Sequence, residues 1–163
     1  MIYNKSMEKY GFEPIYDTNS KILVLGSFPS VKSRAEGFYY GNKQNRFWKT
    51  IAKAVGKPVP DTIPDKISIL LTHNIALWDI VESCEIEGSM DSHIKNPKFA
   101  DILKIVNQTS IKTIICNGKT SFSLLVTHIP SLASITICLP STSPANIRFN
   151  EQIWIKNFTN PTI

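Results

Sequence analysis

A short apolar run at residues 22–25 ends abruptly in a glycine and a long polar loop. The run reads Ile-Leu-Val-Leu and is closed by Gly26, which is typical of a strand buried on both faces of a sheet. Further short apolar runs follow along the chain, and segments with helical spacing of apolar residues separate them. Strands that alternate with helices in this way predict a parallel sheet covered on both faces.

We therefore expect an α/β fold, a three-layer doubly wound domain with a short, mainly parallel central sheet of about four strands flanked by helices. The expected strands are residues 21–25, 75–81, 112–116 and 135–139. The expected helices are residues 45–55, 65–73, 118–128 and 149–158, with one more after Asn96-Pro97. Residues 27–44 and 84–97 are expected to be irregular. We expect one domain over residues 1–163, in which residues 1–15 could form a loose N-terminal arm.

Two polar loops are expected to meet at one edge of this sheet. The first, residues 26–44, follows the strand at 21–25, and the second, residues 139–146, follows the last strand. Both contain a proline flanked by small hydroxyl residues, so they expose backbone N–H groups and let a ligand approach closely. Ligands bind at the carboxyl ends of strands in open α/β sheets. The first loop adds three consecutive aromatic residues, then an amide and a cation, which suits a flat polar ring attached to a phosphate backbone.

Composition narrows the classes of partner. Eighteen Lys and Arg against thirteen Asp and Glu give a net charge of +5, which fits a polyanionic partner without demanding one. Three widely spaced cysteines argue against a disulfide framework and against a zinc or iron–sulfur site. No apolar run approaches the roughly 20 residues that span a bilayer, and the polar N-terminus lacks the apolar core of a signal peptide. We expect a cytoplasmic protein with no membrane, metal or cofactor requirement.

Three segments carry a resemblance to a known family. They are GFYYGNKQNRFWK at residues 37–49, LPSTSPAN at residues 139–146, and IALWDIVESCEIEGSMDSHIKN between them. Together they resemble the uracil-DNA glycosylase superfamily, and more narrowly its hypoxanthine-DNA (deoxyinosine) glycosylase branch, which is related to the mismatch-specific uracil-DNA glycosylases. The resemblance runs from about residue 20 to residue 158.

The resemblance implies a monofunctional DNA glycosylase, without lyase activity, whose partner is DNA containing a deaminated base. Such an enzyme flips the base, chiefly hypoxanthine, out of DNA and hydrolyses the N-glycosidic bond to leave an abasic site. Where the mismatch-specific enzymes have a water-positioning asparagine, this chain has Phe28, which disfavours uracil excision. The resemblance instead implies Asn45 as the catalytic residue and Tyr40 as the ring that stacks on the flipped base.

The remaining candidate residues come from the two loops and their flanks. Those expected to bind the base are Gly26, Ser27, Phe28, Pro29, Tyr40 and Ser143. Those expected to contact DNA are Ser30, Lys32, Arg34, Arg46, Ser141, Thr142, Pro144, Ala145, Asn146 and Arg148. Pro144 and Ala145 are expected to fill the vacated base stack. Because both are small, we expect weak displacement by this loop, or help from Asn146 and Arg148.

Several alternatives stay open at this point. Asn45 could simply cap the following helix, and Tyr40 could be an ordinary core or surface tyrosine. Asp79 could be a structural carboxylate, or it could bond a base or orient a water. For the whole chain, the alternatives are excision of uracil or xanthine by the same site, and a catalytically silent nucleic-acid-binding module. A small-molecule nucleoside hydrolase is less well supported, since no acidic ribose or metal site is visible. We expect a monomer.

Overall fold

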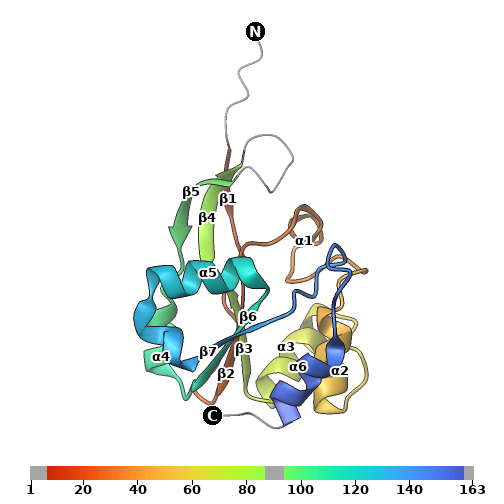
Figure 1. Cartoon of the computed structure of the whole chain (residues 1–163). Helices are drawn as coiled ribbons and strands as arrows, with labels where there is room; N and C mark the ends of the chain where they lie inside the picture. Colours follow the sequence, from red (N-terminus) through yellow and green to blue (C-terminus); the bar gives the residue numbers. More distant parts are fainter. Residues whose placement is uncertain (1–6, 87–93, 160–163) are drawn as a thin grey trace.

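The computed structural model describes residues 7–86 and 94–159. Its central sheet has four parallel strands in the order β3-β2-β6-β7 (Figure 1). These strands are β2 (Ile22–Gly26), β3 (Ile75–Asp79), β6 (Thr113–Asn117) and β7 (Thr136–Leu139), the last preceded by the 3-10 turn η2 (Pro130–Ile135). The four-stranded parallel sheet predicted from the apolar runs is confirmed.

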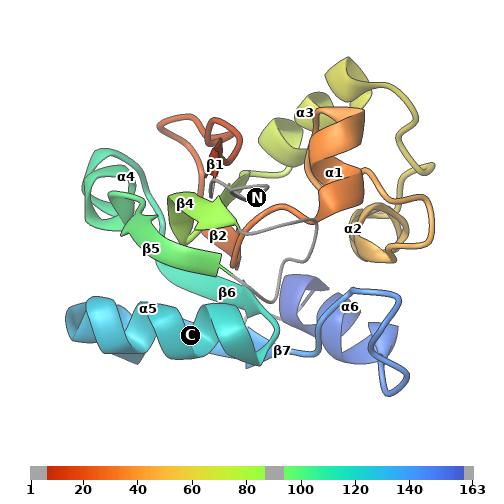
Figure 2. The same ribbon diagram turned by 90° about the horizontal axis from the view of Figure 1, so that it is seen from above.

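Helices cover both faces of this sheet (Figures 1 and 2). One face carries α2 (Phe47–Val55), α3 (Ile63–Thr72) and α6 (Glu151–Thr159), and the other carries α4 (Ile102–Gln108) and α5 (Lys119–His128). A hydrophobic core lies on each face of the sheet, and successive side chains of β2 point to alternate cores. Leu23 and Leu25 pack with α4 and α5, whereas Val24 packs with α2 and α6. This alternation is the pleat of a strand buried on both sides. Among the described helices, none has the length and apolar character needed to cross a bilayer.

Sequence signals account for most helix ends. The helix α2 stops at Gly56, whose φ of 69° is in the left-handed region that favours glycine. The helix α3 begins two residues earlier than expected, because the Thr62 hydroxyl accepts the N–H of Asp65 and Pro64 fits the first turn. A short helix that was not expected, α1 (Val31–Glu36), lies inside the predicted loop at 27–44 and is capped by the Ser30 side chain.

A second sheet was missed by the sequence analysis. It is antiparallel, in the order β1-β4-β5, and consists of β1 (Met7–Tyr10), β4 (Val81–Ile86) and β5 (Ile94–Phe99). The prediction that residues 84–97 are irregular is wrong for 84–86 and 94–97, and residues 87–93 lie outside the described part. Pro97 does not open a helix but lies in β5, where it is tolerated because β5 is an edge strand. The next helix instead begins after Asp101, whose carboxylate caps Lys104.

The N-terminal segment is attached to the body of the protein. The strand β1 pairs with β4, and buried Ile15 exchanges two backbone hydrogen bonds of 2.9 Å with Leu77. The expectation of a loose arm is therefore wrong for residues 7–15, while residues 1–6 lie outside the described range. The predicted strand at 75–81 is divided at Ile80, which separates β3 of the central sheet from β4 of the second sheet.

Candidate active site

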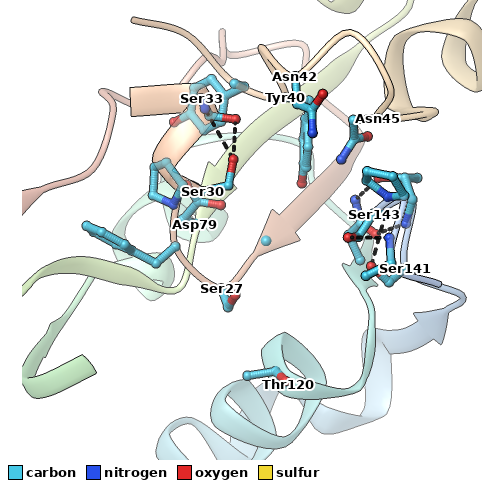
Figure 3. Close-up of a pocket in the computed structure, with 18 of the residues that line it drawn as sticks. Ser27, Ser30, Ser33, Tyr40, Asn42, Asn45, Asp79, Thr120, Ser141 and Ser143 are labelled. Carbon is cyan, nitrogen blue, oxygen red and sulfur yellow. Dashed lines mark hydrogen bonds between the residues drawn. The ribbon is translucent and has the colours of Figure 1, made fainter. Parts of the chain in front are cut away.

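A cavity of about 560 Å³ opens at the carboxyl edge of the central sheet (Figure 3). All four strand ends contribute to it: Gly26 ends β2, Asp79 ends β3, Asn117 ends β6, and the loop from Ser141 follows β7. In the sheet, β2 lies between β3 and β6, so the chain continues from β2 to a strand on one side and later adds β6 and β7 on the other side. The cavity therefore lies where the strand order reverses, which is the usual binding position in open α/β sheets.

Most of the residues predicted from the two loops line this cavity. Those that do are Gly26, Ser27, Phe28, Pro29, Ser30, Tyr40, Asn45, Ser141, Thr142, Ser143, Pro144 and Ala145. The predicted residues that do not line it are Lys32, Arg34, Arg46, Asn146 and Arg148. Lining residues outside the predicted set are Ser33, Tyr39, Asn42, Asp79, Ile94, Asn117 and Thr120. Two of these, Asp79 and Asn117, are the last residues of strands, a position that could have marked them in the sequence.

Asn117 fixes the second loop to the end of β6. Its side-chain oxygen accepts the backbone N–H of Thr142, and its amide nitrogen donates to the Thr142 hydroxyl, both at 2.9 Å. The Thr142 side chain is fully buried as a result. This burial gives the residue a structural role, and its predicted contact with DNA stays a prediction.

Arg46 joins the first loop to the second. Its guanidinium donates to the carbonyl oxygens of Thr142 at 3.4 Å and Asn146 at 2.8 Å, and to that of Ser143 as well. It also lies 4.5 Å from the centre of the Phe149 ring, in cation–π contact. Arg46 thus clamps the loop that forms one wall of the cavity, and its predicted contact with DNA stays a prediction.

Asn45 combines a hydrogen bond to the start of a helix with a donor group. Its side-chain oxygen accepts the N–H of Phe47 at 2.9 Å, which supports the first turn of α2 from the position before the N-cap residue, Arg46. Because a backbone N–H needs an oxygen as its partner, the NH₂ of Asn45 is left to face the cavity. Figure 3 shows this side chain between Tyr40 and Ser143. The hydrogen bond to α2 and a role in chemistry are therefore compatible at this residue.

Asp79 is a buried carboxyl group that faces the cavity. Its side chain is 5% exposed, and its Oδ2 has no hydrogen-bond partner within residues 7–86 and 94–159. Burial raises the pKa of Asp79 from 3.8 to about 7, because loss of hydration disfavours the charged form. A large share of Asp79 is therefore protonated at neutral pH, and the group can donate a hydrogen bond.

The Tyr40 hydroxyl is the second unpartnered polar group of the cavity. It is buried without a hydrogen-bond partner among the described residues. Its pKa is raised well above the ordinary value, first by burial and then by the charge of Asp79; the nearby Asn117 amide opposes this rise without reaching hydrogen-bond geometry. The ring stacks on Phe47 at 4.1 Å, and the backbone is left-handed with φ 51°. Buried polar groups without partners cluster at ligand sites.

The predicted cations outside the cavity differ in their surroundings. Arg34 donates from Nε to the carbonyl of Pro29 at 3.3 Å and lies 5.7 Å from the centre of the Phe28 ring, so it supports the first loop. Lys32 on α1 and Arg148 beyond the second loop are exposed. Their contacts with DNA stay predictions.

Within the described ranges, no three His, Cys, Asp or Glu side chains gather in a way that could hold a metal ion.

Comparison with known proteins shows the family of the chain. The family model described as the uracil DNA glycosylase superfamily matches residues 13–160. A hypoxanthine DNA glycosylase from Methanosarcina acetivorans is 36% identical over 150 residues, which cover 89% of this chain and 92% of the relative. Another, from Methanosarcina barkeri, is 31% identical over 117 residues, covering 71% and 74%. A solution NMR structure from M. acetivorans, described as a candidate uracil DNA glycosylase, superposes with a TM-score of 0.79 at 33% identity, covering 93% of this chain and 97% of that one.

Proposed function

Because the chain belongs to the uracil DNA glycosylase superfamily, we propose that it is a monofunctional DNA glycosylase that removes hypoxanthine from DNA. The relatives named hypoxanthine DNA glycosylases support this choice of base. The observation that carries the proposal is the cavity itself, where Asp79 and Tyr40 present buried polar groups without partners among the described residues. A neutral carboxyl group such as that of Asp79 suits the oxygen or a ring nitrogen of a purine.

The cavity explains how a base could be held after it leaves the duplex. Flipping costs a few kcal/mol and is cheapest where the base is mispaired, as hypoxanthine is opposite thymine. One face of the Tyr40 ring packs on Phe47, and stacking of a base on such a ring returns roughly 1–3 kcal/mol. The stack of Tyr40 on Phe47 fixes the ring before the base arrives, so little ordering is needed on binding.

Asp79 supplies the group that stabilises the departing base. Cleavage of the N-glycosidic bond leaves negative charge on the purine and positive charge on the sugar. A carboxyl group kept neutral by burial can donate a hydrogen bond to O6 or N7 of the purine, and the raised pKa of Asp79 fits this state. Among the described residues, Oδ2 of Asp79 has no hydrogen-bond partner that it must leave first.

Asn45 positions the attacking water. An amide is not a base, but the NH₂ of Asn45 can hold a water by donating to its oxygen, since its own oxygen already accepts from Phe47. A sugar with oxocarbenium character needs a well-placed water more than a strongly activated one. Phe28 lies at the cavity wall without any hydrogen-bonding side chain, so this role falls to Asn45.

DNA with a deaminated base is thus the proposed partner, and this partner supports a particular oligomeric state and cellular location. One cavity per chain is enough to hold one flipped base, which supports a monomer. A chromosomal substrate supports a cytoplasmic location. The exposed cations Lys32 and Arg148 are available for phosphate contacts beside the cavity.

The proposal is tested by single-turnover base release from duplexes that contain one deoxyinosine, deoxyuridine or deoxyxanthosine. Wild type and Asn45→Ala are compared, with DNA binding measured in parallel. We expect release of hypoxanthine by wild type and its loss in Asn45→Ala while binding persists. Binding without release from any duplex would indicate a silent nucleic-acid-binding module. Faster release of uracil or xanthine than of hypoxanthine would contradict the assignment of the base.

A further inference from the structure

Ile147 is an isoleucine held almost entirely in solvent. Ile147 is 93% exposed, more than any other large apolar residue among those described. The next most exposed of these is Tyr10, at 66%. A single exposed apolar residue is common and needs no explanation by itself. Its place in the chain is what matters, because it lies two residues beyond Ala145 at the rim of the proposed active site.

The residues on both sides of Ile147 are fixed to the protein. The Asn146 side chain donates to the carbonyl of Ser141 at 2.9 Å and accepts the N–H of Arg148 at 3.2 Å. The carbonyl of Asn146 accepts from Arg46 at 2.8 Å. On the other side, the Phe149 ring lies under the same guanidinium. The backbone is therefore held in a shape that projects Ile147 outward, and no packing in the core accounts for this.

We propose that Ile147 is the wedge that enters the DNA base stack when the target base is flipped; this inference rests on the proposed glycosylase function. Apolar side chains such as isoleucine are used in this way to unstack base steps. Pro144 and Ala145, the residues expected to fill the gap, line the cavity but have little volume. Ile147 supplies the volume that they lack. Arg148 follows it in the chain and is exposed, so it can hold a flanking phosphate while the wedge is inserted.

The test compares Ile147→Ala and Ile147→Leu with a matched control, Ile63→Ala. Ile63 is also exposed, at 43%, and lies in α3, where it does not line the cavity. Single-turnover release is measured on deoxyinosine opposite thymine and on the same strand unpaired. We expect Ile147→Ala to slow release from the duplex by about tenfold or more, the effect of a barrier raised by roughly 1.4 kcal/mol. Release from the single strand, and both rates in Ile147→Leu and Ile63→Ala, should stay near wild type.

A second readout reports insertion without chemistry. A 2-aminopurine placed beside the deoxyinosine brightens when its neighbour is unstacked, so binding of wild type should raise its fluorescence and binding of Ile147→Ala should not. Equal duplex rates and equal fluorescence for wild type and Ile147→Ala would overturn the proposal. So would equal slowing on duplex and single strand. If wild type releases no base from the duplex, the proposed function fails. If wild type releases the base from the duplex but not from the single strand, the two release rates cannot be compared. In both cases the fluorescence difference alone decides the role of Ile147.

Discussion

The carboxyl group of Asp79 lies directly against the backbone of Gly26. A Cβ added at residue 26 would stand 2.3 Å from Oδ1 of Asp79 and 3.0 Å from the Tyr40 hydroxyl. The parallel register of β2 and β3 pairs these two residues at the ends of their strands. Glycine, which has no side chain, is therefore needed at position 26 so that both polar groups can point into the cavity.

Gly26→Ala is expected to displace Asp79 and Tyr40 together. We expect a loss of about 1–3 kcal/mol in the free energy of unfolding from overpacking, and a fall of about tenfold or more in base release as the donors move. Chemical denaturation and single-turnover release measure the two effects. Gly11→Ala is the control, because a Cβ there would meet its nearest atom, the Glu82 carbonyl oxygen, at an ordinary 3.4 Å. Full activity of Gly26→Ala would contradict the proposed placement of the donors.

The ionisation of Asp79 should appear in the pH dependence of activity. If the neutral carboxyl group donates to the departing base, release should fall as pH rises through its pKa of about 7. Asp79→Asn keeps an N–H donor but has no such ionisation, so its release should lose this fall. Single-turnover rates between about pH 5.5 and 8.5 measure the difference. The same fall in both proteins would show that another group is responsible.

The same ionisation should affect stability. The unfolded chain loses this proton near pH 3.8, whereas the folded protein keeps it up to about pH 7. The folded state therefore binds more protons in this window, and its stability must fall as pH rises through it. We expect the Tm of wild type to decrease relative to that of Asp79→Asn between these two pH values and to run parallel above them. A constant difference in Tm would mean that the pKa of Asp79 is not raised.

The central sheet could be predicted because its strands are buried on both faces. Each is a short apolar run such as Ile22–Gly26, and such runs differ clearly from the helices between them. The second sheet offered no such signal. Its edge strand β5 exposes most of its side chains and contains Pro97, which at the sequence level reads as the start of a helix. Tertiary pairing with β4 outweighs these local preferences.

The loops of the site were predicted from the sequence, but the arrangement of its buried polar groups was not. Loop chemistry is local, so residues such as Asn45 could be found from the sequence. The position of Asp79 over Gly26 depends on strand register, and the clamp by Arg46 joins residues about a hundred positions apart. Neither follows from a local pattern. The exposure of Ile147 likewise results from the way this clamp holds the loop.

Tyr40→Phe is expected to move stability and activity in opposite directions. The hydroxyl is buried without a partner among the described residues, so its removal should raise the free energy of unfolding by up to about 1 kcal/mol. Base release should fall by about tenfold if the hydroxyl bonds another part of the bound substrate or a held water. In the matched variant Tyr39→Phe, the lost hydroxyl donates to the Glu13 carbonyl at 2.7 Å, so stability should decrease by about 1 kcal/mol. Denaturation curves and release rates that fall together in Tyr40→Phe would assign that hydroxyl a structural role.

The proposed chemical role of Asn45 can be separated from its hydrogen bond to α2 with a second asparagine that bonds the start of a helix. Asn150 precedes α6, and its side-chain oxygen accepts the N–H of Gln152 at 3.0 Å, as that of Asn45 accepts from Phe47 at 2.9 Å. Asn150 does not line the cavity. Each alanine variant should lose about 1 kcal/mol of stability with this hydrogen bond. Release should fall about a hundredfold in Asn45→Ala alone, with unchanged affinity for DNA. Equal activity in the two variants would mean that Asn45 only supports the start of α2, and that another residue of the cavity positions the water.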